Sequence, residues 1–400
     1  MFELIVSIII GCVLGVITGL IPGLHTNTIA LLLMGGVVSG WLNFSGALFV
    51  SGAVCMLVVH SFVDYVPSIF LGAPNSDTVL SVLPGHKLLL KGEGYFALRE
   101  TVAGGIISFL IGMPFLILFI WFIKNWLSVL KLFVAPVLII LTTWLILSES
   151  SVNKIVWATL IFIWAGVLGV LSLNTSIIKD PLFPLLSGFF GISILLFSMK
   201  DKGHVPKQKF DDEFELFSVR NIFLGFISLF ASSLMVLFPS LGPTQSATVA
   251  QAVMKKSSQR KFLNVMGGIN TLDVLFTIVM LYFVGSARSG VLVAVQQLFE
   301  VNFEIFMIML FSLFVGIGVG TISCLYIGKR VGKIVSKINY KLISIGVIVF
   351  LSGMVFVLSG SVGLFLMSIS TSIGIVSQII GIKKVHAMGV LTIPTILNFS

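Results

Sequence analysis

Long apolar runs separated by short polar segments dominate the pattern of this chain. A membrane-spanning helix needs roughly 20 consecutive apolar residues, and most of the runs reach that length. They show no strict alternation of apolar and polar positions, which argues against an outer-membrane barrel. The pattern predicts an all-α, polytopic membrane helix bundle of about ten to twelve crossings with broken or re-entrant helices. The runs cover residues 2–21, 44–63, 101–123, 132–148, 155–173, 182–199, 221–238, 262–284, 303–327, 342–359, 361–382 and 386–399.

One polar segment, residues 200–220, divides the chain into nearly equal parts. It predicts a first membrane repeat over 1–199, a cytoplasmic linker over 200–220 and a second membrane repeat over 221–400. Similar breaks follow in the same order in both halves. Pro22–Thr28 matches Pro239–Ser246, Gly72–Leu80 matches Gly285–Leu292, and Pro184 matches Pro394.

The charges of equivalent loops predict that the two repeats have opposite orientations. The loop after the first break carries no charge in the first half, whereas its counterpart in the second half carries four basic residues. Cytoplasmic loops are enriched in Lys and Arg. An inverted repeat with an external N-terminus places 20 of the 24 Lys and Arg on the cytoplasmic side. Those loops are 84–100, 149–154, 200–220, 255–261, 329–341 and 383–384.

Composition narrows the class of protein further. Hydrophobic residues make up 57% of the chain and charged residues 10%, and the mean hydropathy is +1.15. The net charge of +9 lies in short loops between apolar spans, so it reflects membrane topology and not a nucleic-acid partner. Cysteine and histidine are dispersed without ligand-like spacing, so the sequence predicts no disulfide, metal or cofactor. The chain is therefore expected in the cell (inner or plasma) membrane as a multi-pass protein.

The Pro22 and Pro239 breaks predict a binding site within the membrane. A break frees backbone groups that lipid cannot satisfy, and such backbone is tolerated where it lines a wet cavity. Half-helices that begin there present N-terminal N–H groups to a ligand. The alternative is that the polar side chains only cap kinked helices. The predicted substrate-binding residues at the two breaks are Thr26, Asn27, Thr28, Thr244, Gln245 and Ser246.

Arg288 lies in an apolar stretch of the second half, opposite Asn75 in the predicted repeat. A charge within the bilayer is costly and usually marks a pathway or an ion pair. A guanidinium can hold a carboxylate or phosphate through two parallel hydrogen bonds. Snorkelling, or a structural pair with Asp77 or Asp273, is the alternative. Around Arg288, the predicted substrate-binding residues also include Asn75, Ser76, Ser286 and Ser289.

Three acidic residues, Asp64, Asp77 and Asp273, lie in or beside the apolar spans. Carboxylates in such positions can bind Na⁺ or carry a proton, and we predict that these three couple transport to an ion gradient. Alignment of the two repeats sets Asp273 opposite His60. A structural ion pair or a helix cap is an equally open interpretation for each carboxylate, and Asp77 precedes an apolar run in the manner of a cap.

These residues resemble the large permease subunit of the tripartite tricarboxylate transporters, the TctA family, most closely its shorter archaeal members. The resemblance lies in Pro22–Leu24, in Gly72–Pro74, in the stretch Leu83–Gly94 and in the breaks at Pro239 and Gly285. It implies a permease for di- or tricarboxylates driven by an ion gradient, with an extracytoplasmic binding protein and a small membrane subunit as partners. The chain departs from the family in its shorter length and in the polar continuation after Leu24.

The sequence predicts a secondary transporter for a small organic anion, and two other functions are alternatives to it. A translocase for an anionic lipid such as an isoprenoid phosphate would use the same arginine and helix N-termini. An enzyme is not predicted, because the sequence has no Gly-x-Ser-x-Gly, no His-Glu-x-x-His and no acidic pair within a span. A phosphate-binding loop of an ATP-driven pump is also absent. A homo-oligomer is compatible with the sequence.

Overall fold

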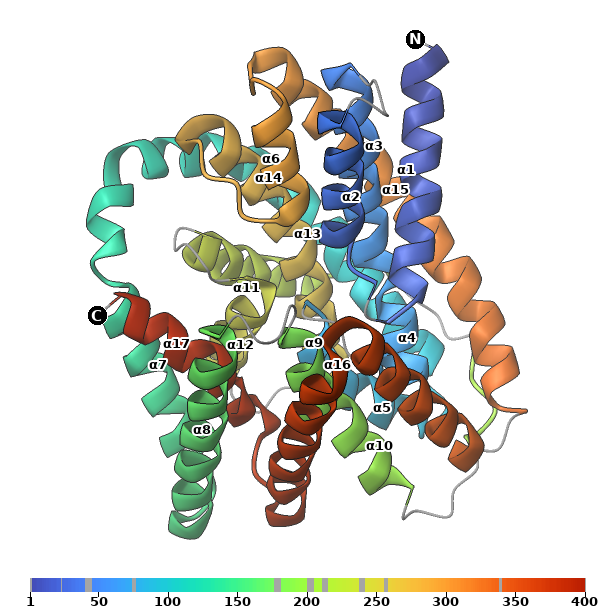
Figure 1. Cartoon of the computed structure of the whole chain (residues 1–400), viewed down its shortest axis with the longest axis vertical. Coiled ribbons are helices and arrows are strands. Elements are labelled where there is room, and N and C mark those ends of the chain that lie inside the picture. The colour runs from blue at the N-terminus through green and yellow to red at the C-terminus, as the bar shows by residue number, and fades with distance from the viewer. Residues whose placement is uncertain are drawn as a thin grey trace.

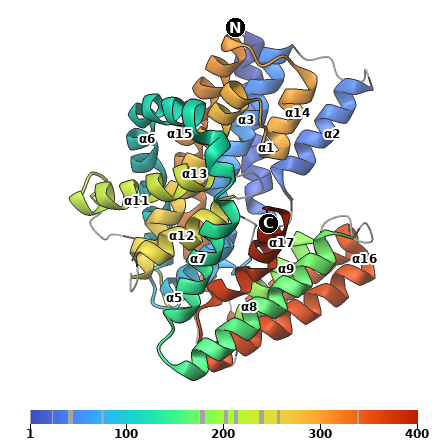
Figure 2. The same ribbon diagram turned by 90° about the vertical axis from the view of Figure 1, so that its left-hand side faces the viewer.

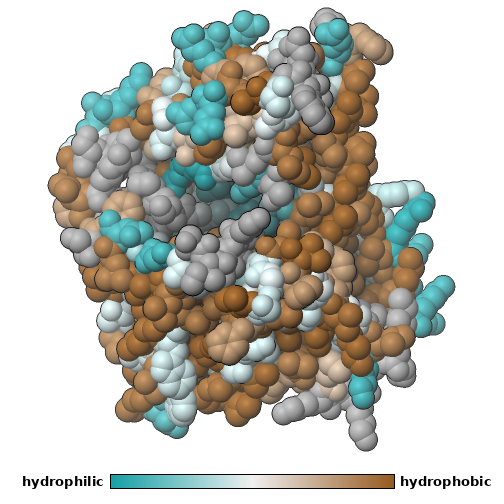
Figure 3. All heavy atoms as spheres, viewed as in Figure 1, coloured by the Kyte–Doolittle hydropathy of each residue, from teal (hydrophilic) through white to brown (hydrophobic). Residues whose placement is uncertain are grey.

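The computed structural model is helical throughout the part of the chain that it describes (Figure 1). Many large apolar side chains of α1, α8, α15 and α16 point outward, and hydrophobic atoms cover most of the face in Figure 3. An outer surface of this kind is the one that a bilayer requires. The described residues are 2–22, 24–39, 45–73, 77–175, 181–199, 205–210, 215–236, 242–254, 258–337 and 340–399, a few side chains within them excepted.

Seven helices of the described chain are long and apolar enough to cross a membrane. They are α1 (Phe2–Leu20), α3 (Gly46–Val63) continued by α4 (Tyr65–Phe70), α6 (Gly94–Lys131), α8 (Val152–Leu173), α13 (Gln259–Val284), α15 (Phe303–Val335) and α16 (Tyr340–Ile380).

Shorter helices fill the space between the long ones. They are α2 (Thr26–Val38), η1 (Val79–Ser81), α5 (Val82–Leu89), α7 (Val134–Leu147), α9 (Leu182–Leu186), η2 (Ser187–Ile192), α10 (Ser193–Ser198), α11 (Val219–Val236), α12 (Pro243–Met254), α14 (Gly290–Leu298), η3 (Lys384–Met388) and α17 (Gly389–Phe399).

The difference from the expected ten to twelve crossings has two sources. Several predicted spans are helices shorter than a crossing, such as α7 and α11. α16 counts as one helix, although Gly360, with φ 66° and ψ −164°, separates two helical segments that match the predicted runs 342–359 and 361–382. Only glycine adopts this conformation without strain, so α16 consists of two helical segments that meet at Gly360.

The order of helices and their contacts recur in the two halves. α1 packs on α3 as α11 packs on α13, and α3 packs on α15 as α13 packs on α6. α17 lies against α8, and α9, η2 and α10 lie against α16. Figure 2 shows α8, α9, α16 and α17 grouped beside the bundle that contains α1, α3 and α15. Each half therefore completes its packing with helices of the other. The opposite orientation of the halves and the boundaries at 199 and 221 stay predictions.

The basic loops gather at one end of the molecule. The linker contacts the loop before α6, because Gln208 Nε2 donates to the Leu89 carbonyl at 3.1 Å and Gln208 Oε1 accepts from the Gly94 N–H at 2.7 Å. Arg260 forms an ion pair with Glu93 at 2.8 Å. At the same end, Lys333 lies over the Phe210 ring. The Lys383 N–H donates to Glu149, and Gly381 lies near Lys154. Loops that the charge pattern assigned to one side of the membrane thus meet in space.

Glycines allow the long helices to approach closely. Small residues are common where membrane helices pack, because the backbones can then come into contact. Gly11, Gly15 and Gly19 line the face of α1 that meets α3. In the central pair, a Cβ on Gly104 of α6 would lie 1.7 Å from the carbonyl oxygen of Asn264 on α13. The core between α6 and α13 is therefore a contact of backbone against backbone.

A buried ion pair joins the loop between α7 and α8 to η3. Glu149 Oε1 lies 2.8 Å from His386 Nε2 and accepts a hydrogen bond from the Lys383 N–H at 3.1 Å. Burial raises the pKa of Glu149, but the hydrogen bonds and charges of His386 and Lys383 together lower it by more, so the pKa lies below the usual value of a Glu. The ionised form of Glu149 therefore stabilises the folded protein.

We expect Glu149→Gln to flatten the dependence of stability on acid pH. The folded pKa is depressed, so this stabilisation is complete above the unfolded value of about 4.3 and is lost as the pH falls through the folded pKa. Thermal unfolding of the purified protein, measured from about pH 6 to pH 3, should show a steeper fall in Tm for the wild type than for Glu149→Gln. The exposed Glu300→Gln is the matched control and should follow the wild type. Parallel curves for Glu149→Gln and the wild type would refute the role of this carboxylate.

Candidate functional site

A polar cavity of about 170 Å³ lies where helices of both halves begin or pass. α2, α12 and α14 start at its wall, α3 lines it near its C-terminal end, and α13 crosses it near the middle of its length. On the face seen in Figure 3 the molecule is hollowed, and the floor of the hollow is hydrophilic within a largely hydrophobic surface. The cavity is lined by His25, Thr26, Asn27, Leu57, His60, Ser61, Asp77, Gly242, Pro243, Asn270, Asp273, Val274, Thr277, Arg288 and Ser289.

The two crossing helices supply polar side chains from one face each. His60 and Ser61 lie three and four residues after Leu57 on α3, and Asn270, Asp273 and Thr277 recur at intervals of three and four residues on α13. This spacing places side chains in line on one side of a helix. Apolar residues between them are buried in the core, so the rest of both helices is held by packing. The cavity therefore has rigid walls.

The helix N-termini at the wall give the cavity a positive bias. Free N–H groups and the helix dipole favour an anion at this end of a helix. Ser289 Oγ accepts from the Leu292 N–H at 3.3 Å in α14, and Gln245 Oε1 accepts from the Gly242 N–H at 2.9 Å before α12. His25, the N-cap of α2, makes no side-chain cap hydrogen bond. The first turn of α2 thus keeps backbone donors for a ligand.

The cavity also carries one arginine and two carboxylates. Arg288 is partly buried and donates from Nη1 to the Val236 carbonyl. It shares the lining with Asp77 and Asp273, of which Asp273 comes from the middle of α13. A guanidinium beside carboxylates at membrane depth can bind an anionic ligand while the acids hold a cation or a proton. The charges therefore suit an anion and a positive ion together.

Asn270 is the most direct sign of a ligand within this lining. Its side chain is 3% exposed, and neither Nδ2 nor Oδ1 has a hydrogen-bond partner in the described structure. An unsatisfied buried amide costs about 1–3 kcal/mol for each group. His60, in the same lining, has a partner, because its Nδ1 lies 3.0 Å from Thr18 Oγ1. A polar ligand in the cavity would give the Asn270 amide its missing partners.

Comparison with known protein families decides which class of protein holds this cavity. The family model described as "Tripartite tricarboxylate transporter TctA family" matches residues 5–389. The chain belongs to the TctA family. This TctA protein is 26% identical over 356 residues to "Uncharacterized protein MJ1079" of Methanocaldococcus jannaschii, covering 86% of this chain and 87% of that protein. No solved structure matches the TctA chain.

Membership of the TctA family confirms the resemblance that the sequence motifs indicated. It makes this chain a multi-pass membrane protein of a transporter family, which is consistent with the absence of a predicted enzymatic activity. The family does not favour the lipid-translocase alternative. Among the described residues, no three His, Cys, Asp or Glu side chains converge as a metal site requires.

Six of the predicted site residues of the TctA chain line the cavity, and others do not. Gln245 and Ser246 instead bond to Gly242 beside their own break, because they lie within the first turn of α12 and their side chains return to the helix start. Those in the lining are Thr26, Asn27, Asp77, Asp273, Arg288 and Ser289; those outside it are Asp64, Thr244, Gln245, Ser246 and Ser286. Asn75, Ser76 and the side chain of Thr28 lie outside the described part of the structure.

Asp64 is buried at the junction of α3 and α4. Its Oδ2 accepts from Thr78 Oγ1 at 2.9 Å, and Ser68 Oγ lies 2.7 Å from the same hydroxyl. These contacts tie the segment before η1 to the broken end of α3. The observed role of Asp64 is structural, and its part in ion coupling stays a prediction.

Sequence reasoning did not assign His25, Ser61, Asn270 and Thr277 to the site. A usable signal was present on α13, since Asn270, Asp273 and Thr277 share one face of an otherwise apolar helix. These polar residues lie inside an unbroken apolar span, where no break in the hydropathy pattern marks them. His25 was noted in the first break only as part of its motif.

Gly290 offers a test of the geometry on the α2 side. A Cβ at this position would lie 2.8 Å from Cβ of Asn27, so Gly290→Ala must displace the Asn27 side chain. We expect the KM for the transported anion to rise about fivefold, the cost of one hydrogen bond of about 1 kcal/mol. Gly353→Ala, where a Cβ meets nothing within 4 Å, is the control. Unchanged uptake kinetics in Gly290→Ala would exclude Asn27 from the binding site.

Proposed function

We propose that this chain is the permease of a secondary active transporter for a small organic anion, a di- or tricarboxylate, in the cell membrane. The observation that carries the proposal is the central cavity, in which Arg288 and the uncapped start of α2 face the unsatisfied amide of Asn270. Family membership supports tricarboxylate transport. The carboxylate chemistry of the substrate agrees with the donors of the cavity.

In this proposal the anion binds between Arg288 and the N-terminus of α2. One carboxylate of the substrate accepts from the guanidinium, and a second accepts from the backbone N–H groups that follow His25. The Asn270 amide donates to a carboxylate or hydroxyl oxygen. Thr26 and Ser289 complete the polar wall. A substrate with two or more carboxylates satisfies all of these donors at once, whereas a monocarboxylate leaves some unpaired.

Asp77 and Asp273 provide the coupling site in the same cavity. A bound anion at Arg288 leaves two carboxylates that repel it unless they are neutralised. Na⁺ bound by their oxygens, or a proton on one of them, removes this repulsion and makes anion and cation binding mutually favourable. The driving ion then enters with the substrate. Uptake measured with a Na⁺ gradient and with a proton gradient distinguishes the two coupling ions.

Transport by alternating access follows from a site shared by the two halves. The wall is built from α2 and α3 of residues 1–199 and from α12, α13 and α14 of residues 221–400. If the halves are inverted repeats, rocking of one group of helices against the other opens the cavity to each side in turn. The tripartite family also supports an extracytoplasmic binding protein and a small membrane subunit as partners. A homo-oligomer is compatible with this arrangement.

Uptake into proteoliposomes tests the proposal. Purified wild-type protein should accumulate labelled citrate or succinate when a Na⁺ or proton gradient is imposed, and the accumulation should collapse with an ionophore for the coupling ion. A monocarboxylate such as acetate is the control substrate. Folded protein that moves no carboxylate, with either gradient and with added binding protein, would refute the proposed function.

A further inference from the structure

A second cavity, of about 330 Å³, lies at the end of the molecule where the basic loops meet. Lys87 of α5 lines it together with Gln251 of α12, Gln259 at the start of α13, and Lys383 and Lys384 beside η3. Helices of both halves therefore form its wall. None of the predicted substrate-binding or ion-coupling residues lines this cavity.

The lining of the second cavity is basic, and no carboxylate belongs to its described wall. Lys384 is buried and donates to the Phe189 carbonyl at 3.1 Å and to Ser193 Oγ at 2.8 Å. Lys383 Nζ donates to Ser148 Oγ at 2.6 Å. Lys87 is exposed to the cavity. Burial lowers the pKa of Lys384 well below its usual value, so the positive charge of the wall rests on Lys383 and Lys87, of which Lys87 is available to a ligand.

The amides of Gln251 and Gln259 add donors to the same wall. A positively charged concave surface with additional N–H donors attracts and concentrates anions. Carboxylates and phosphates are the ligands that lysine and amide donors satisfy. The chemistry of the second cavity is therefore that of a small polyanion.

Only a thin apolar partition separates the second cavity from the central one. Asp77 lines the central cavity, whereas Val79 and Leu80 line the second. On α13, Asn270 lines the central cavity and Phe262 the second, about two helical turns or roughly 12 Å apart. α12 runs between the same two cavities, from Pro243 to Gln251.

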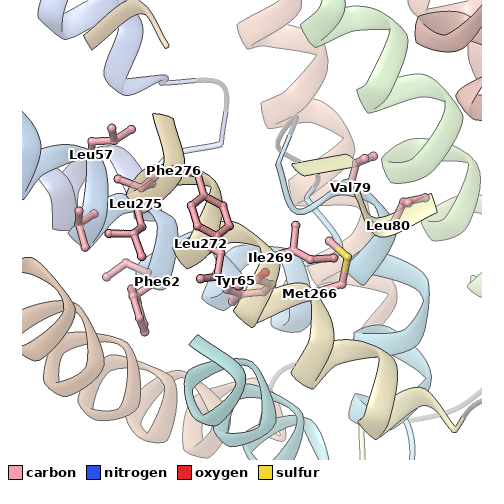
Figure 4. Close-up of a cluster of buried hydrophobic side chains, with 14 of the residues drawn as sticks. Leu57, Phe62, Tyr65, Val79, Leu80, Met266, Ile269, Leu272, Leu275 and Phe276 are labelled. Atoms are coloured by element: carbon pink, nitrogen blue, oxygen red, sulfur yellow. The ribbon is translucent and has the colours of Figure 1, made fainter. Parts of the chain in front are cut away.

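The partition consists of large side chains that pack together. Val79, Leu80, Met266 and Ile269 belong to one buried cluster, in which α13 contacts η1 (Figure 4). Met266 and Ile269 have no exposed surface. A close-packed apolar layer excludes water and ions. Movement of η1 away from α13 would open a direct path between the two cavities.

We infer that the second cavity is the inner vestibule of the transport path, an anion-binding site that receives the di- or tricarboxylate after the partition opens. This inference rests on the proposed function and assigns a second site to the same substrate. Lys87 is its principal contact, and the partition of Val79, Leu80, Met266 and Ile269 is its gate. The basic loops around the vestibule identify it with the cytoplasmic side.

An asymmetric effect on kinetics tests the vestibule. In vesicles of defined orientation, Lys87→Gln should raise the KM for citrate added on the side of the basic loops by about fivefold, since one charged contact is worth about 1 kcal/mol. The KM on the opposite side should stay unchanged. Lys91→Gln is the matched control, because Lys91 is exposed in the same loop but does not line the cavity. Equal KM changes on both sides, or no change on either, would overturn the inference.

A binding experiment that needs no transport separates this inference from the proposed function. The three native cysteines are buried, so a membrane-impermeant thiol reagent should label Leu83→Cys, a half-buried position of the vestibule lining that leaves Lys87 in place, selectively and only from the side of the basic loops. Citrate at millimolar concentration should slow the labelling, whereas acetate should not. Labelling that citrate leaves unchanged, or that phosphate slows and citrate does not, would overturn the vestibule for carboxylates. If citrate slows the labelling but the wild-type protein takes up no citrate, the result counts against the proposed function alone.

Discussion

Arg288→Gln is expected to reduce gradient-driven uptake of a di- or tricarboxylate by at least about 30-fold. Removing one partner of a buried, charge-assisted contact costs about 2–5 kcal/mol, and each 1.4 kcal/mol is a factor of ten in binding. Arg288 is the one basic residue with a permanent charge in the described lining of the central cavity. Without it, the substrate would face Asp77 and Asp273 with no compensating cation from the protein.

The design of this experiment separates binding from folding. Arg288 donates to the Val236 carbonyl at the end of α11, so the variant is first compared with the wild type by thermal unfolding and gel filtration. Arg288→Lys keeps the charge but not the paired donors, and it should retain part of the uptake. Arg330→Gln, on an exposed arginine over Tyr326, is the control and should transport normally. A folded Arg288→Gln protein with wild-type uptake would remove Arg288 from the substrate site.

Gly104→Ala is expected to cause the largest loss of stability. Its Cβ would lie 1.7 Å from the Asn264 carbonyl oxygen, so the backbones of α6 and α13 must move apart along the central contact of the bundle. Overpacking of a dense core costs about 1–3 kcal/mol and sometimes more. The thermal unfolding midpoint of the purified protein should fall accordingly. The same shift should also disturb the cavity, because α13 carries Asn270 and Asp273.

Gly318→Ala is the matched control for this prediction. Gly318 lies in α15, and a Cβ there meets nothing within 4 Å. Alanine is a better helix former than glycine by about 1 kcal/mol, so Gly318→Ala should leave the midpoint unchanged or raise it. The two substitutions are chemically identical, yet Gly104→Ala should lower the unfolding midpoint and Gly318→Ala should not. A stable Gly104→Ala protein would contradict the close approach of α6 and α13.

Much of this architecture could be predicted from the sequence, because a bilayer imposes simple rules. The lengths of apolar runs indicated spanning helices, and the structure confirmed an all-helical membrane bundle in its described part. The Pro22 and Pro239 breaks correctly predicted that new helices begin there, at α2 and α12. Arg288 stood out because a charge among apolar residues needs a polar environment, and the cavity provides one.

The number of membrane crossings was harder to predict from the sequence. Apolar residues that pack in the protein interior and those that face lipid have the same composition. In the described chain α7 and α11 are apolar but shorter than the seven helices that are long enough to cross a membrane, and the sequence alone assigned each of them a span. The bend at Gly360 is likewise a matter of backbone conformation, which glycine permits without requiring it.

The sequence by itself determined that this protein is a membrane helix bundle of the TctA type with polar breaks and an intramembrane arginine. Only the tertiary structure decided which polar residues share a cavity. It brought His25, Asp77, Asn270 and Arg288 together and left Gln245 to cap its own helix. The physical reason is that hydropathy depends on one residue at a time, whereas a site depends on how α2, α3, α13 and α14 pack. That packing is set by close helix contacts between residues far apart in the chain, such as the contact of Gly104 on α6 with Asn264 on α13.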